Sequence, residues 1–286
     1  MNKLEEFRKT KDCRALSISY LKMSYGSRKE FEVYKKRTGS EKKTLNPTKY
    51  SWQQIEEICN VITDLYIDNY VEKEGMLPSN IDIESLVVNQ LGCKIVYENL
   101  DQAADSLGFS ANGVEKCVVT RDGQRVEVVF PKDTIVLDNY LLSMRNYPQK
   151  RFVLAHEAGH IIKSRIAQTS EARYCHANNI PVKNKSDLLS RFSITEAEAN
   201  NFAASLLMPE NLVKILMNRY YGDRVIYKYS DDILDPTDAD NICAMARELC
   251  VSYTAMYYRL KRLGLIQDGV IETFVEENIL GDSLVE

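Results

Sequence analysis

The segment His156-Glu157-Ala158-Gly159-His160 constrains this chain more than any other, and it lies inside an apolar run. Phe152 to Ala155 precede it and Ile161-Ile162 follow it, a pattern that predicts a buried helix. Two histidines four positions apart lie on one face of a helix, so both imidazoles can reach one metal ion. Glu157 can then face a metal-bound water as a general base. The chain has only three histidines, and two of them stand in this segment.

A metal site that hydrolyses a bond needs a third protein ligand, and the segment from Thr195 to Pro209 offers one. Sites of this kind usually take three protein ligands and leave the fourth position to water. Apolar residues and small alanines recur here at helical spacing, and Ser193 or Thr195 can cap the helix. Glu196 and Asn200 would share one face of it. Glu196 could therefore ligate the metal while Asn200 hydrogen-bonds a ligating histidine.

Glu198 lies in the same segment and is the weaker candidate ligand. At about 100° per residue, its side chain points about 160° away from that of Asn200. The alternative for the whole segment is an ordinary amphipathic helix with solvated glutamates. We favour the metal site because of the histidine pair upstream.

The two segments together resemble the ImmA/IrrE family of zinc-dependent metallopeptidases. The shared pattern is His-Glu-x-x-His followed by Glu-x-x-Ala-Asn-x-Phe-Ala-x-x-Leu-Leu-Met-Pro. Single weaker matches, such as Gly108-Phe109-Ser110 and Val251-Ser252, extend the resemblance to residues 55–266. It implies His156, His160 and Glu196 as the metal ligands, Glu157 as the catalytic glutamate, and a helix-turn-helix repressor as the protein substrate.

The rest of the chain has the pattern of an α+β protein. Apolar spacing predicts helices over 51–71 and 81–91, the first with Ser51 as its cap, and later helices over 210–220, 238–249 and 252–263. Strands are expected over 93–97, 115–120, 124–130 and 134–138, with Asp122-Gly123 as a hairpin turn. With the resemblance, this predicts a zincin-like core whose small mixed sheet packs on the metal-binding helices, plus a C-terminal helix-turn-helix-like part.

Charge divides the chain into parts. Residues 1–50 hold fourteen Lys and Arg against six Asp and Glu, whereas the remainder is acidic. We interpret 1–50 as a basic appendage or linker, 51–220 as the metallopeptidase domain and 221–286 as a C-terminal helical region. The basic head could bind nucleic acid or an acidic protein surface. The simpler interpretation, which we favour, is a solvated tail.

The segment from Lys163 to Arg191 is longer than the resemblance leads us to expect. It predicts a long irregular loop containing Tyr174-Cys175-His176. Cys175 or His176 could occupy the open metal position and silence the site, and Tyr174 or His176 could donate to an oxyanion. We favour a solvated loop that never touches the metal.

Two other classes of function compete with a peptidase. Arg259, Lys261 and Arg262 on the last predicted helix could read DNA, or the chain could act by binding a regulatory partner alone. We disfavour both, because neighbouring acidic residues oppose phosphate binding and a binding module needs no general base. A two-histidine, one-carboxylate set suits Zn²⁺ but also Mn²⁺ or Fe²⁺. Scattered cysteines and the lack of an apolar signal or membrane segment predict a cytoplasmic protein.

Overall fold

The computed structural model describes residues 50–100, 107–167, 185–229 and 233–270, with the backbone path alone over 185–194. The chain divides into two compact units, residues 1–207 and 208–286. The second unit thus includes residues 210–220, which the sequence grouped with the metallopeptidase domain. The basic appendage lies outside the described residues, apart from Tyr50.

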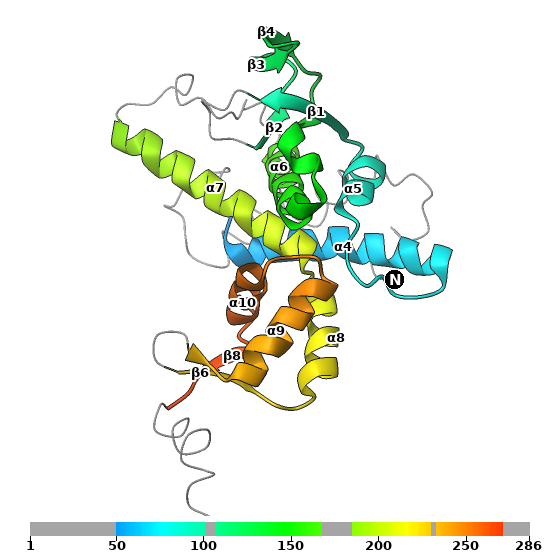
Figure 1. Ribbon diagram of the computed structural model, residues 1–286, viewed down its shortest axis with the longest axis vertical. Coiled ribbons are helices and arrows are strands. Elements are labelled where there is room, and N and C mark those ends of the chain that lie inside the picture. Colours follow the sequence, from blue (N-terminus) through cyan, green and yellow to red (C-terminus); the bar gives the residue numbers. More distant parts are fainter. Residues whose placement is uncertain (1–49, 101–106, 168–184, 230–232, 271–286) are drawn as a thin grey trace, which may run out of the picture. The chain divides into compact units, whose positions relative to one another are not determined.

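A five-stranded sheet with the order β2-β5-β1-β3-β4 forms one layer of the first unit (Figure 1). Its strands are β1 (Lys94–Leu100), β2 (Gly108–Ala111), β3 (Lys116–Arg121), β4 (Gln124–Val129) and β5 (Thr134–Asp138). β1 and β5 run parallel, and the other neighbours run antiparallel, so the sheet is mixed as predicted. β2 and β4 stand at its two edges, a point that the sequence left open.

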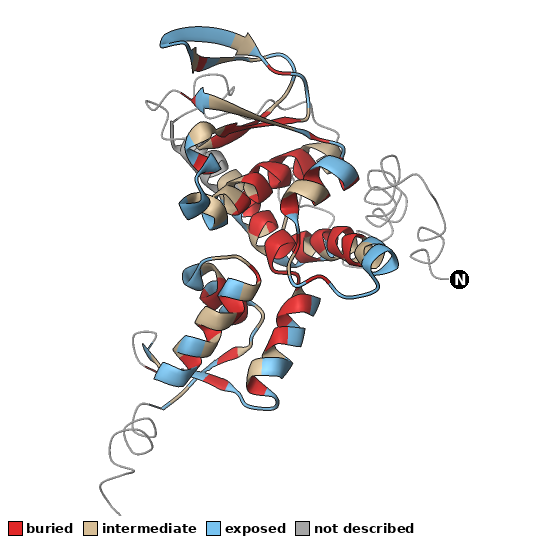
Figure 2. Cartoon of the chain, turned by 45° about the vertical axis from the view of Figure 1, so that its right-hand side comes forward, coloured by how far each residue is buried: buried red, intermediate tan, exposed pale blue. Residues whose placement is uncertain are grey.

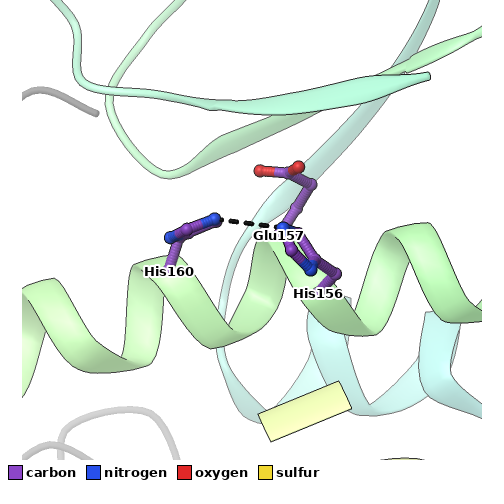
Figure 3. A group of neighbouring side chains, drawn as sticks. All are labelled: His156, Glu157 and His160. Carbon is purple, nitrogen blue, oxygen red and sulfur yellow. Dashed lines mark hydrogen bonds between the residues drawn. The ribbon is translucent and has the colours of Figure 1, made fainter. Parts of the chain in front are cut away.

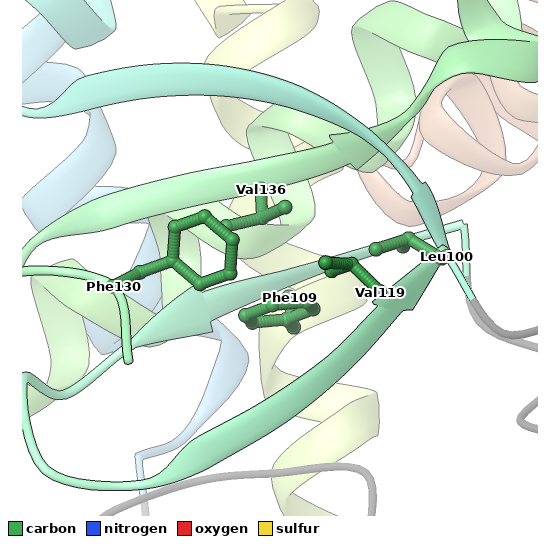
Figure 4. Packing of buried hydrophobic residues seen from close by; sticks show 5 residues of the cluster. All are labelled: Leu100, Phe109, Val119, Phe130 and Val136. Atoms are coloured by element: carbon green, nitrogen blue, oxygen red, sulfur yellow. The ribbon is translucent and has the colours of Figure 1, made fainter. Parts of the chain in front are cut away.

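The β3–β4 hairpin turns at Asp122 and Gly123, as the Asp-Gly pair predicts. Their φ angles are 51° and 75°, and a two-residue turn of this type needs positive φ at both positions. The hairpin curls over one face of the sheet and closes a hydrophobic cluster there (Figure 4). The buried members of the cluster are Leu100, Phe109, Val119, Phe130 and Val136.

The opposite face of the sheet meets the helix that carries the histidine motif. Side chains alternate across a strand, so if Phe109 and Val136 face the hydrophobic cluster, their neighbours Ser110 and Ile135 face the other way. That second face packs on α6 (Tyr147–Ala167), which contacts both β2 and β5. Two short 3-10 turns, η3 (Asn139–Leu142) and η4 (Met144–Asn146), connect β5 to α6.

Two further helices complete the first unit. α4 (Trp52–Glu74) begins with the predicted Ser51 cap and ends at Gly75. The Ser51 side chain accepts a hydrogen bond from the Gln54 amide, and the Ser51 amide donates one to the Gln54 side chain. The predicted helix over 81–91 is the short α5 (Ile83–Ser85) followed by a π-helical turn, η1 (Leu86–Gln90). α4 packs against α7 (Lys185–Leu207), which in turn packs against α6, and buried residues concentrate along these helices (Figure 2).

α7 begins earlier than predicted. Neither Ser193 nor Thr195 caps it, because the helix starts at Lys185 and includes both residues. Leu188, Leu189 and Phe192 continue the apolar helical spacing upstream, so the helix has no reason to begin at 193. The stretch from Lys163 to Arg191 is therefore helical at both ends and not one long irregular loop.

The second unit contains α8 (Glu210–Tyr221), α9 (Pro236–Glu248) and α10 (Tyr253–Arg262), all close to the predicted bounds. Ser252 caps α10 by accepting a hydrogen bond from the amide of Ala255. The sequence predicted no strand after residue 138, but short strands lie in the described part of this unit. β6 (Ile226–Tyr229) pairs with β7 (Ile233–Leu234) and, in parallel, with β8 (Ile266–Asp268). Strands this short carry no alternation that could reveal them.

Candidate metal centre

His156 and His160 point their imidazoles toward one spot from successive turns of α6 (Figure 3). Their Nε2 atoms lie 3.2 Å apart. His160 is buried, and the side chain of His156 is 15% exposed. The four-residue spacing that predicted a shared face thus produces two nitrogen atoms at nearly the same place.

α7 brings Glu196 to the same spot. One carboxylate oxygen lies 3.1 Å from Nε2 of His156 and the other lies 3.5 Å from Nε2 of His160. Donor atoms at bonds of about 2.0–2.1 Å around a tetrahedral zinc ion stand about 3.3 Å apart. The three donors of this centre are therefore spaced as zinc requires. The side chain of Glu196 is 35% exposed, so the centre opens to solvent on this side.

Asn200 fixes the ring of His156 from behind. Its Oδ1 lies 2.9 Å from Nδ1 of His156, so an Nδ1–H can donate to it and leave the Nε2 lone pair facing the other donors. His160 differs, because its Nδ1 is buried without a hydrogen-bond partner among the described residues. The sequence singled out Asn200 for this contact, and the structure brings the two groups together.

Glu157 lies beside these donors and belongs to the same helix. Its carboxylate and the two imidazoles lie within 4.8 Å of one another, and Glu157 itself is buried. The hydroxyl of Ser110, on the edge strand β2, donates a hydrogen bond to this carboxylate. Burial raises the pKa of Glu157, while the two histidines and Ser110 act in the opposite direction. A carboxylate with a raised pKa accepts a proton more readily near neutral pH.

Without metal, the donors stabilise one another as an ion pair. Burial acts to lower the pKa of His156, but the hydrogen bond with Glu196 and the charges of Glu157 and Glu196 outweigh it and raise that pKa. Burial acts to raise the pKa of Glu196, but the hydrogen bonds from both histidines outweigh it and hold that pKa well below its usual range. Glu196 is thus a deprotonated carboxylate, which is the form that binds metal.

Gly159 matters for the assembly of this centre, and the sequence reasoning missed its role. A Cβ at Gly159 would stand 2.6 Å from Cβ of Phe202 and 3.4 Å from the carbonyl oxygen of Ala199. α6 and α7 can approach this closely only because residue 159 lacks a side chain. A glycine inside a long helix makes the helix about 1 kcal/mol less stable than alanine would. Its presence at position 159 therefore indicates, from the sequence alone, that a close contact requires it.

The remaining candidate residues of the sequence do not contribute a donor to this centre in the described part of the chain. Tyr174, Cys175 and His176 lie outside the described residues. Glu198, the weaker candidate ligand, is buried and pairs with Lys163 of α6. Arg259, one of three basic residues considered for DNA contacts, is 2% exposed and donates to the carbonyl oxygen of Met208, so it is not available at the surface.

A family model, the IrrE N-terminal-like domain of Peptidase_M78, matches residues 88–261. The chain belongs to this family. The match agrees with the resemblance noted in the sequence, and the α+β architecture is that of a zincin-like domain of the IrrE type. It includes both metal-centre helices as well as α9 and α10. A comparison with curated protein sequences gave no significant match.

The family assignment supports a metallopeptidase-like domain built around the histidine centre. α4 precedes the matched range, although it packs on α7 within the first unit. No helix in the described ranges is long and apolar enough to cross a membrane.

Proposed function

We propose that this Peptidase_M78 protein is a zinc-dependent endopeptidase. The observation that carries the proposal is the position of the Glu157 carboxylate beside three converging donors, His156, His160 and Glu196. A site that only stored a metal would have no need of a buried carboxylate placed next to its ligands. Zn²⁺ fits the donor set best, and Mn²⁺ or Fe²⁺ would also accept it.

The side chains have separate tasks in this proposal. His156, His160 and Glu196 would hold the metal, which when bound supplies Lewis-acid activation of the water and of the scissile carbonyl. Glu157 accepts a proton from the attacking water and passes it to the leaving amine. Asn200 keeps His156 in the orientation and tautomer that ligation needs.

Ser110 connects the general base to the edge of the sheet. Its hydroxyl restrains the Glu157 carboxylate, and its own strand, β2, stands at the end of the sheet order. An extended peptide could pair with β2 as an additional strand, which would bring a backbone carbonyl close to the general base. This placement favours a protein substrate over a small molecule.

We propose a cytoplasmic regulator, specifically a helix-turn-helix repressor, as the substrate. The support is the resemblance to the ImmA/IrrE family, together with cysteines that are scattered along the sequence, a pattern that suits a reducing compartment.

Co-expression with the regulators encoded beside the gene tests the proposal. We expect one of them to be cleaved by the wild-type protein and to stay intact with Glu157→Gln, while both proteins bind zinc in equal ratio. The carboxamide cannot accept the proton, and loss of a general base typically costs about 10²–10⁴-fold in rate.

One control variant and one contradicting outcome make the result decisive. Glu127→Gln removes a carboxylate on the exposed hairpin and should leave cleavage unchanged. Cleavage by metal-loaded, pure Glu157→Gln protein would exclude Glu157 as the general base.

A further inference from the structure

The buried ion pair between Lys163 and Glu198 joins the two helices that carry the metal centre. Lys163 belongs to α6 and Glu198 to α7, and their side chains are 2% and 4% exposed. One carboxylate oxygen of Glu198 contacts the Lys163 ammonium, and the other accepts a hydrogen bond from the backbone amide of Tyr50 at 2.6 Å. Neither charge is needed for the chemistry at the metal, so the pair requires another explanation.

The pair and the metal centre lie on opposite flanks of α7. Glu196 and Glu198 are two residues apart, which places their side chains about 200° apart around the helix. Ala199 stands between the two flanks, with its carbonyl oxygen close to Gly159 of α6. α6 therefore contacts α7 along its middle, holds Glu196 and Asn200 on one flank, and holds Glu198 on the other.

The two flanks differ in how strongly they fix the rotation of α7. Asn200 is exposed and Glu196 partly exposed, so a small rotation would return both to water. Glu198 and Lys163 are buried, and a rotation that separates them breaks an ion pair that is shielded from water. Such separation is strongly unfavourable, which is why a buried pair can select one arrangement even where it adds little net stability.

We propose that Lys163 and Glu198 are a positioning pair that sets the rotation of α7 so that Glu196 faces His156 and His160. The inference rests on the proposed metal site and deepens it. The pair would raise metal affinity without touching the metal, because it holds the third ligand in place before the metal binds.

Two folded variants of the full-length chain separate positioning from mere packing. Glu198→Gln keeps one oxygen, which can accept from Lys163 while the new amide nitrogen faces the Tyr50 amide, so the link between the helices survives. Lys163→Met combined with Glu198→Gln removes that link, and it leaves no buried charge and nearly the same volume. The two proteins thus differ only at residue 163.

Zinc affinity, measured by competition with a chromophoric chelator, is the readout. We expect Glu198→Gln to remain within about threefold of wild type and the double variant to bind zinc about tenfold or more weakly, the low end of the cost of losing a direct hydrogen-bond partner of a ligand. The visible absorption spectrum of the Co²⁺-loaded double variant should also change, since its ligand geometry changes. Thermal melting of the metal-free proteins should show both variants folded at the assay temperature.

A control removes an ion pair of the same residue types on the β3–β4 hairpin. Lys116 and Glu127 form an exposed ion pair across the β3–β4 hairpin. Lys116→Met combined with Glu127→Gln should leave zinc affinity and the Co²⁺ spectrum unchanged.

Glu198→Asp provides a second test that does not depend on the stability of the double variant. It keeps the charge but shortens the side chain, so α7 must shift for the pair to form, and zinc affinity should fall severalfold. Wild-type zinc affinity in the folded double variant or in Glu198→Asp would overturn the positioning role. A wild-type protein that binds no zinc would overturn this inference and the proposed function together, whereas zinc binding without cleavage of any protein would count against the proposed function alone.

Discussion

Arg165 of α6 forms an ion pair with Asp133, 2.9 Å away at the start of β5. The same guanidinium donates to the carbonyl oxygen of Leu91 at 2.7 Å. Asp133 has a φ of 62°, so the loop that presents it adopts a conformation that few residues other than glycine favour. This contact joins the end of the metal-centre helix to the loop before β5 and to the segment before β1.

Arg165→Met should therefore loosen the attachment of α6 to the sheet. The side chain of Arg165 is only 14% exposed, and hydrogen bonds to charged groups typically contribute about 1.5–3 kcal/mol each. We expect a loss of about 2 kcal/mol in the free energy of unfolding, measured with urea. Arg121→Met, which removes an ion pair between a half-exposed Arg121 and Glu98, should cost clearly less. Equal losses in the two variants would show that the Arg165 contact is no stronger than a surface pair.

Gly159→Ala tests the close approach of α6 and α7. An added methyl would stand 2.6 Å from Cβ of Phe202, so the helices must separate. Overpacking of this kind costs about 1–3 kcal/mol, partly offset by the better helix propensity of alanine, about 1 kcal/mol. The variant should melt at a lower temperature than wild type and bind zinc more weakly, because Glu196 moves away from the histidines.

A change to alanine elsewhere supplies the comparison. Glu72→Ala lies at an exposed position of α4 and should leave both melting temperature and zinc affinity unaltered. A Gly159→Ala protein as stable as wild type, with full zinc affinity, would mean that the two helices are not held at this distance in solution.

Asn200→Ala should weaken zinc binding without preventing it. The variant loses the acceptor 2.9 Å from Nδ1 of His156, so the ring is no longer held in the ligating orientation. Loss of such a partner typically costs about 10–100-fold in metal affinity. Removal of a direct ligand, as in His160→Ala, should cost more. Asn89→Ala, at an exposed asparagine of the π-helical turn, serves as the control in the same chelator competition assay.

The pH dependence of the metal-free protein tests the ion pair within the centre. The raised pKa of His156 adds stability that is fully present below about pH 6.5 and is lost as pH rises through the folded-state value. The lowered pKa of Glu196 adds stability that is present above about pH 4.3 and is lost as pH falls through the folded-state value. Both contributions coincide between these two pH values.

Melting temperatures of chelator-treated wild type and Glu196→Gln, recorded from pH 4 to pH 8, measure this effect. We expect wild type to exceed the variant most clearly between about pH 4.3 and 6.5, and the difference to shrink at higher pH as His156 loses its proton. With zinc added, stability should instead increase with pH, because protons compete with the metal for the same histidine. Parallel profiles for the two metal-free proteins would show that His156 and Glu196 do not interact.

Much of this fold follows from local sequence. Ser51 with Gln54, the Asp122-Gly123 turn and Ser252 each specify a helix start or a hairpin through contacts within a few residues. The start of α7 was misplaced because Ser193 and Thr195 are good caps that also fit inside a helix. β6 and β8 were missed because their pairing joins Ile226 to Ile266, and nothing near either residue encodes that partner.

The sequence by itself determined that two histidines share a face of α6, and it named Glu196 and Asn200 as their partners, because helical spacing is a local property. Only the tertiary structure decided that Ser110 reaches Glu157, that Gly159 admits Phe202, and that Glu198 turns away from the metal to pair with Lys163. The physical reason is that these contacts depend on how helices and strands far apart in the chain pack. Packing depends on the shape and charge of both packed elements together, so the sequence of either element alone does not predict it.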